Sequence, residues 1–117
     1  MTSPYETVIS YNHGICYKTM NIGNGISVTL KEKDEHGISS ASVKLPSYAQ
    51  NMFKQERTKK QFKSLDVDIK VSTAGGLALF GEESKIYESF KTVKSVISML
   101  EEAYNNFIER HPLSRKV

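Results

Sequence analysis

SKIYESFKTVKSVISMLEEAYNNFIERH, residues 84–111, carries the strongest helical pattern in the chain. Its apolar positions recur at intervals of four and three residues, which places them on one side of a helix. They are Ile86, Phe90, Val93, Ile97, Leu100, Tyr104 and Phe107. Glu82 and Glu83 precede the segment, where the positive end of a helix dipole favours acids, and Ser84 is a candidate N-cap. Pro112 predicts where the helix ends.

Two uses fit this helix, and the sequence leaves both open. A 3.5-residue repeat is typical of a coiled-coil seam, so the seven residues are a candidate protein interface, for example in a homodimer. Further apolar residues widen the stripe, which favours packing on a sheet of the same chain. These flanking residues are Tyr87, Val96, Ala103 and Ile108. We expect the helix to pack on the chain's own sheet, with its outer edge available to a partner.

Strand patterns fill the first half of the chain. Residues 5–11, 15–20, 26–31 and 38–44 are β-rich or alternate between apolar and polar side chains, which is the period of half-buried strands. Turn residues separate these segments, most clearly Asn24-Gly25, because Asn-Gly readily adopts positive φ. Four strands in a meander are therefore predicted.

The second half adds a helix and two more strands. Ser47 and Gln50 form a capping-box pattern at the start of a helix expected over residues 48–62. Residues 65–71 alternate cleanly, and a glycine-rich turn leads into a short strand at residues 77–80.

These elements predict the α+β class, in the order ββββα-ββ-α. We expect an antiparallel sheet of about six strands with two helices gathered on one face, the long C-terminal helix packed on the sheet. A chain of 117 residues fits one core. Residues 1–112 are expected to form this single domain, and residues 113–117 a mobile C-terminal tail.

Composition indicates the cellular compartment in which the protein is expected. Cys16 is the only cysteine, which excludes an internal disulfide and fits a reducing environment. No run of about 18 apolar residues occurs, and the first residues show no secretory pattern. We therefore expect a cytoplasmic protein without a membrane partner. The net charge of +3 is mild, so its distribution is more informative than its size.

The densest charge lies in residues 54–63, within the second-half helix. Five cations against one carboxylate, Glu56, leave a net charge of +4 there. The cations are Lys54, Arg57, Lys59, Lys60 and Lys63. On one continuous helix Lys54, Arg57 and Lys60 share a side, and such a row neutralises phosphates and releases counterions. The segment is therefore a candidate nucleic-acid-binding site; the alternative is a solvated face that only keeps the protein soluble.

The element order, four strands followed by a helix, resembles that of the small dimeric single-strand-binding domains of transcriptional coactivators. The resemblance lies in element order alone and implies a nucleic-acid ligand. Tyr5, Tyr11 and Tyr17 are candidates for stacking on bases. The alternative is that these rings lie in the core or form cross-strand pairs.

No phosphate loop is predicted, although Gly75-Gly76 and Gly81 stand on either side of residues 77–80. A phosphate loop needs Lys and Ser or Thr directly after its last glycine, because these residues bind the phosphates and Mg²⁺. Here Glu82 and Glu83 stand in those places, and two carboxylates repel phosphate. A hairpin turn is expected instead.

No metal, cofactor or catalytic site is predicted either. His13 and Cys16 have a ligand-like spacing, but a second pair of ligands is missing. Asp66 and Asp68 are expected on the solvent face of a strand. No local pattern joins a histidine to a nucleophile, so we do not expect an enzyme.

The sequence therefore predicts a non-catalytic binding or regulatory protein that contacts nucleic acid electrostatically through its basic helix. The alternative hypothesis is a protein-interaction module, either an adaptor or an inhibitor, that uses the final helix or a sheet edge. In its simplest form this module is a homodimer.

Overall fold

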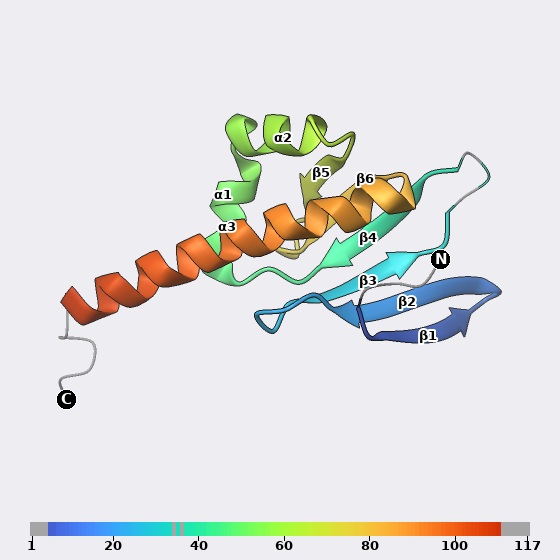
Figure 1. The fold of residues 1–117 in the computed structure, drawn as a ribbon, viewed down its shortest axis with the longest axis horizontal. Helices are drawn as coiled ribbons and strands as arrows, with labels where there is room; N and C mark the ends of the chain where they lie inside the picture. The colour runs from blue at the N-terminus through green and yellow to red at the C-terminus, as the bar shows by residue number, and fades with distance from the viewer. Residues whose placement is uncertain (1–4, 34, 36, 111–117) are drawn as a thin grey trace.

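An antiparallel sheet forms the body of the molecule in the computed structural model, which describes residues 5–33, 35 and 37–110 (Figure 1). The strands of this part are β1 (Thr7–Asn12), β2 (Ile15–Asn21), β3 (Ser27–Lys31), β4 (Ser39–Val43), β5 (Asp68–Val71) and β6 (Leu77–Gly81). Their spatial order is β1-β2-β3-β4-β6-β5, so β6 lies between β4 and β5. The predicted α+β class and six-stranded antiparallel sheet are confirmed.

Tight turns connect the first three strands. Asn12 pairs with Ile15, which leaves the two-residue loop His13-Gly14 with φ values of 52° and 79°. Two successive positive φ values characterise the type I′ turn, whose twist matches that of a hairpin. Asn24-Gly25 adopts φ values of 57° and 72°, so the turn predicted at this position is confirmed.

The helices differ from the prediction in the middle of the chain. They are η1 (Ser47–Ala49), α1 (Gln50–Lys54), α2 (Glu56–Lys63) and α3 (Glu83–Arg110). The single helix predicted over residues 48–62 is wrong, because Gln55 has an extended backbone with ψ of 141°. Phe53 and Phe62 lie nine residues apart, so a continuous helix would point them in opposite directions. The break buries both rings, with centroids 6.1 Å apart.

The two helix caps predicted from the sequence are not found at the predicted residues. The capping box predicted at Ser47 and Gln50 is wrong, because the N-cap of η1 is Pro46, which has no hydroxyl. Ser84 was expected to cap the final helix, but it lies inside α3, which begins at Glu83.

Gln55→Ser is expected to raise the free energy of unfolding by about 0.5–2 kcal/mol. Gln55 is the N-cap of α2 and its side chain makes no capping hydrogen bond. A serine hydroxyl at this position accepts a hydrogen bond from an N–H of the first helical turn. Urea unfolding followed by circular dichroism measures the gain. Gln61→Ser, at an exposed position inside α2, is the control; an equal gain there would contradict the capping explanation.

The fifth strand is shorter than predicted. The strand expected over residues 65–71 begins only at Asp68. Asp66 adopts φ of 61° in the turn after α2, where the N–H of Val67 donates a hydrogen bond to the carbonyl of Phe62. Asp66 therefore lies in a turn, and not beside Asp68 on a strand face as predicted.

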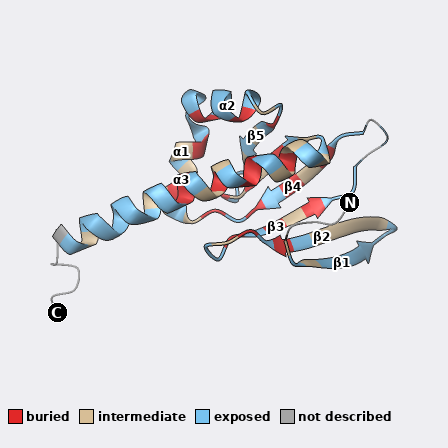
Figure 2. Ribbon diagram, in the orientation of Figure 1, coloured by how far each residue is buried: buried red, intermediate tan, exposed pale blue. Residues whose placement is uncertain are grey.

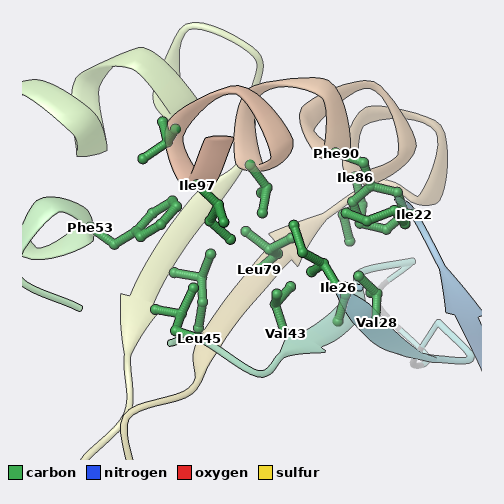
Figure 3. Packing of buried hydrophobic residues seen from close by; sticks show 14 of the residues in the cluster. Ile22, Ile26, Val28, Val43, Leu45, Phe53, Leu79, Ile86, Phe90 and Ile97 are labelled. Carbon is green, nitrogen blue, oxygen red and sulfur yellow. The ribbon is translucent and has the colours of Figure 1, made fainter. Parts of the chain in front are cut away.

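One face of the sheet and the helices share an apolar core (Figures 2 and 3). Figure 3 shows Val28, Val43 and Leu79 of the sheet packed beneath Phe90 and Ile97 of α3. The four apolar residues at the start of the α3 stripe are all buried: Ile86, Phe90, Val93 and Ile97. The prediction that the long C-terminal helix packs on the sheet is confirmed.

An ion pair joins the sheet to the start of α3. Lys18 Nζ of β2 lies 2.9 Å from Glu83 Oε1, and both side chains are partly exposed. The hydrogen bond to Glu83 raises the pKa of Lys18. Such a pair contributes at most about 1 kcal/mol. Since the charged form of Lys18 is favoured, this contribution is present at neutral pH and is lost as the pH rises through the raised pKa.

The second half of α3 extends past the sheet (Figures 1 and 2). The helix has 28 residues, which corresponds to about 42 Å. Residues 101–107 are all exposed, in contrast to the buried stripe before them. Among the described residues, no helix combines the length and the apolar content that a membrane span requires.

Candidate nucleic-acid interface

The basic segment, residues 54–63, lies beside β5 at one edge of the sheet. Its five cations, predicted as phosphate contacts, are all exposed: Lys54, Arg57, Lys59, Lys60 and Lys63. Thr58 and Phe62 are buried. These two residues are one helical turn apart and anchor α2 on the core, which leaves its other positions to solvent. The structure therefore presents the whole set of predicted cations on the surface.

The cations do not form the single row that was predicted. Lys54 is the last residue of α1, whereas Arg57 and Lys60 belong to α2. The extended backbone at Gln55 separates the two groups, so the prediction of one cationic side on one helix is wrong. Arg57 Nη2 lies 3.4 Å from Gln55 Oε1, which keeps the guanidinium close to the break. Charge is presented from two short helices that meet at an angle.

Two of the cations have acidic neighbours. Lys63 Nζ lies 3.1 Å from Asp68 Oδ1 of β5, and Lys59 Nζ lies 3.8 Å from Glu56 Oε1. All four side chains are exposed to solvent, so these pairs are weak and a polyanion can compete for the lysines. A shallow hollow of about 230 Å³ separates the two pairs.

The other three cations differ in having no acidic partner among the described residues. Within the part of the chain that the structure describes, Lys54, Arg57 and Lys60 form no ion pair. Their side chains are long and solvated, so they can reach a phosphate backbone without disturbing the core. These three residues therefore contribute most of the positive potential of the basic segment.

A second surface, which the sequence analysis missed, is the sheet face turned away from the helices. We call it the open face. The strand register aligns its side chains in rows across the sheet. The first row contains Ser10, Tyr17, Lys31, Ser40, Phe80 and Asp68. The second row contains Val8, Thr19, Thr29, Ser42, Ala78 and Lys70.

The open face is hollowed along its second row. The hollow measures about 410 Å³, and Thr29, Ser42, Lys44 and Ala78 are among its lining residues. Short side chains form its floor because the second row carries threonine, serine and alanine on the central strands. Phe80 of the first row is 39% exposed. The open face thus has a shallow trough lined by hydroxyl groups and a lysine, and an exposed aromatic ring in the neighbouring row.

The three tyrosines proposed for base stacking are separated by the fold. Tyr5 packs against Tyr87 and Phe90, with ring centroids 6.2 and 5.8 Å apart, which is the core role given as the alternative. Tyr11 lies on edge strand β1, on the helix side of the sheet, and is 73% exposed. Tyr17 belongs to the open face. Only one of the three can therefore act together with Phe80.

The α3 stripe divides into a core part and an exposed part. Its first four residues are buried, as described above, so a partner cannot reach them in the folded protein. Leu100 is partly buried against the core. Tyr104 and Phe107 are 50% and 56% exposed, and Met99 on the flank is 54% exposed. The candidate protein interface is therefore the last third of the predicted stripe.

Tyr48 of η1 links α3 to the rest of the helical layer. Its ring stacks on that of Tyr104, with centroids 5.6 Å apart and planes inclined by 11°. Partial burial, and then the charge of Glu101, raise the pKa of Tyr48. The stacking of Tyr48 on Tyr104 therefore attaches the exposed C-terminal part of α3 to η1.

The remaining candidates do not assemble a site. His13 lies in the β1–β2 turn and Cys16 on β2. Within the described ranges, no three His, Cys, Asp or Glu residues gather to hold a metal ion. The hairpin predicted in place of a phosphate loop is confirmed, because β5 and β6 pair and Ser72 N–H donates to Gly76 O at 2.7 Å.

Comparison with known proteins adds no family. The chain matches no protein-family model, no curated protein and no solved structure. Its function is therefore argued from the surfaces described above.

Proposed function

We propose that this chain is a non-catalytic, cytoplasmic nucleic-acid-binding protein that contacts phosphates through the basic segment. The observation that carries the proposal is the exposure of all five cations of residues 54–63. A net charge of +4 on two short helices attracts a polyanion, and each neutralised phosphate releases a counterion. The mechanism is electrostatic, so it needs no base-specific contact.

The basic segment is anchored on the core by two buried rings. Phe53 belongs to α1 and Phe62 to α2, so each of the two helices that carry the cations is attached to the core. The lysine and arginine stems remain free to adjust to the phosphate spacing. Anchored helices that carry flexible lysine and arginine side chains suit a nucleic acid, whose phosphate backbone is regular whatever its base sequence.

Fluorescence anisotropy of labelled single- and double-stranded oligonucleotides tests the proposal. The protein is expected to bind at about 50 mM salt, and its affinity should fall about 20-fold or more on raising the salt to about 200 mM, for three or more phosphate contacts. A neutral peptide nucleic acid of the same sequence is the control and should not bind. Absence of binding to both nucleic acids at low salt would reject the proposal.

A second proposal concerns the exposed end of α3, where Met99 and Tyr104 are half exposed on a helix that extends past the sheet. We propose that a second copy of the chain packs there, because the 4-3 spacing of the stripe continues through Leu100 and Tyr104 as in a helix–helix seam. This is the homodimeric form of a protein-interaction module; an adaptor or inhibitor would offer the same surface to another protein.

Tyr104→Glu is expected to convert the dimer of this second proposal into a monomer. A carboxylate buried between two apolar helix faces has no cation to pair with, so it opposes association. Multi-angle light scattering measures the molar mass of both proteins at high concentration. Asn106→Glu adds the same charge on the opposite side of α3 and should leave the mass unchanged. A native protein that is already monomeric would overturn self-association.

A further inference from the structure

We infer that the open face of the sheet binds a single-stranded nucleic acid, with Tyr17 and Phe80 as stacking platforms for two of its bases. The inference rests on the proposed function and deepens it, because it names the strand form and a second contact surface. The basic segment would then hold the backbone at one edge of the sheet, and the open face would hold the bases.

The strand order brings the two rings into one row. Tyr17 pairs with Lys31, Lys31 with Ser40, and Ser40 with Phe80, so both aromatic side chains emerge on the same face. Adjacent strands lie about 4.8 Å apart, which separates the two positions by about 14 Å. That distance leaves room for a nucleotide between the two stacked bases. Phe80 keeps 39% of its surface in water on a face that no described helix covers, so a base would shield it.

The trough beside this row suits base edges. Thr29 and Ser42 line it, and Thr19 continues the second row next to Thr29; their hydroxyl groups donate and accept hydrogen bonds. The hydroxyl oxygens of Thr19 and Thr29 lie 3.4 Å apart, so two adjacent strands present polar atoms side by side. Ala78 continues the floor without obstructing it. A planar base stacked in the first row can therefore direct its polar edge into the second.

Charge on the open face favours a phosphate backbone. Three lysines occupy the face or line its trough: Lys31, Lys44 and Lys70. Asp68 is the acid of the first row, and Lys63 of the basic segment lies 3.1 Å from its Oδ1. Asp68 therefore stands where the open face meets the basic segment, and the cations continue on both sides of it. A protein ligand of acidic character would use the same lysines but not the two rings.

A single strand fits this surface better than a duplex does. In a duplex the bases are stacked on one another, so their faces are closed to Tyr17 and Phe80. The major groove of B-DNA admits a helix or a two-stranded ribbon. A six-stranded sheet is wider than such a ribbon, so its open face does not fit into the groove. A single strand exposes its base faces and lies along a flat surface, where aromatic side chains stack on it without regard to sequence.

The double variant Tyr17→Ala, Phe80→Ala tests the inference against a labelled oligothymidylate and a duplex of equal length. Loss of each ring is expected to weaken single-strand binding about 5- to 150-fold, while the salt slope stays the same because no charge is removed. Duplex binding through the basic segment should be unchanged. Ile9→Ala, an exposed residue on the other face of β1, is the control and should bind as the native protein does.

Tyrosine fluorescence provides a second readout, since the chain contains no tryptophan. Stacking of a base on Tyr17 should quench part of the emission, and the Phe80→Ala protein, whose fold circular dichroism checks, should retain that part of the quenching. Native-like single-strand affinity in the double variant overturns the inference and leaves the proposed function standing. A preference of the native protein for duplex over single strand also overturns the inference and leaves the proposed function standing. Binding of an acidic protein but of neither nucleic acid overturns both.

Discussion

Phe62→Ala is expected to lower the free energy of unfolding by about 3–5 kcal/mol, which is the usual cost of deleting a buried phenylalanine ring. Phe62 is fully buried and packs on Phe53 across the break between α1 and α2. Its loss leaves a cavity under α2 and removes the anchor of the basic segment. Because small domains are stable by only about 5–15 kcal/mol, the effect is a large fraction of the total.

Urea unfolding followed by circular dichroism measures this loss, and Phe62→Leu extends the series if the alanine variant does not fold. Phe80→Ala removes the same ring from an exposed position and should cost less than about 1 kcal/mol. A double-mutant cycle of Phe53→Leu and Phe62→Leu is expected to show coupling of about 0.5–1.5 kcal/mol, since the two rings touch. Strict additivity would mean that the two residues lie apart, as they would on one continuous helix.

The combined substitution Lys54→Gln, Arg57→Gln, Lys60→Gln is expected to lower single-strand affinity about 100-fold at about 0.1 M salt. Each lost phosphate contact reduces the slope of log K against log salt by about 0.7, so three contacts remove about 2 units. A change of 2 in the slope, with unchanged affinity at 1 M salt, amounts to two decades at 0.1 M. Anisotropy titrations at four or five salt concentrations give both quantities.

The matched control removes three cations from α3 instead: Lys85, Lys91 and Lys94. Both triple variants lower the net charge of the chain equally, so a general effect of protein charge would appear in both. Only the variant of the basic segment is expected to change the slope by the full amount. A native slope in that variant would show that Lys54, Arg57 and Lys60 make no phosphate contact.

The fold was predictable where the pattern is local. The 4-3 spacing of α3 and the Asn24-Gly25 turn depend on neighbours within a few residues, and both predictions are confirmed. The break at Gln55 was not predictable in this way, because neither glycine nor proline marks it. It follows from the need to bury Phe53 and Phe62 in the same core, which is a tertiary requirement.

In the candidate site, too, the local features were predictable from the sequence and the tertiary arrangement was not. The five cations of residues 54–63 were found because a run of charge is visible in sequence, although their arrangement on two helices was not. The row that joins Tyr17 to Phe80 runs through four strands, and its last step is the pairing of Ser40 with Phe80. That pairing spans 40 residues of sequence, so no local pattern reveals it. The alternation of apolar and polar residues along a strand predicts on which face of the sheet a side chain lies, but not which side chains of other strands lie next to it.

The position of β6 between β4 and β5 also has a consequence for the order in which the chain acquires structure. During synthesis the first 71 residues provide a four-strand meander and, separately, β5, which pairs only with β6. Until β6 emerges, the two parts lack the strand that joins them, and its pairing with β4 must close a loop of more than 30 residues. Closure of such a loop costs entropy before it gains contacts. β6 is therefore the strand that completes the sheet, and a ribosome-bound chain without it exposes an unpaired β4 edge.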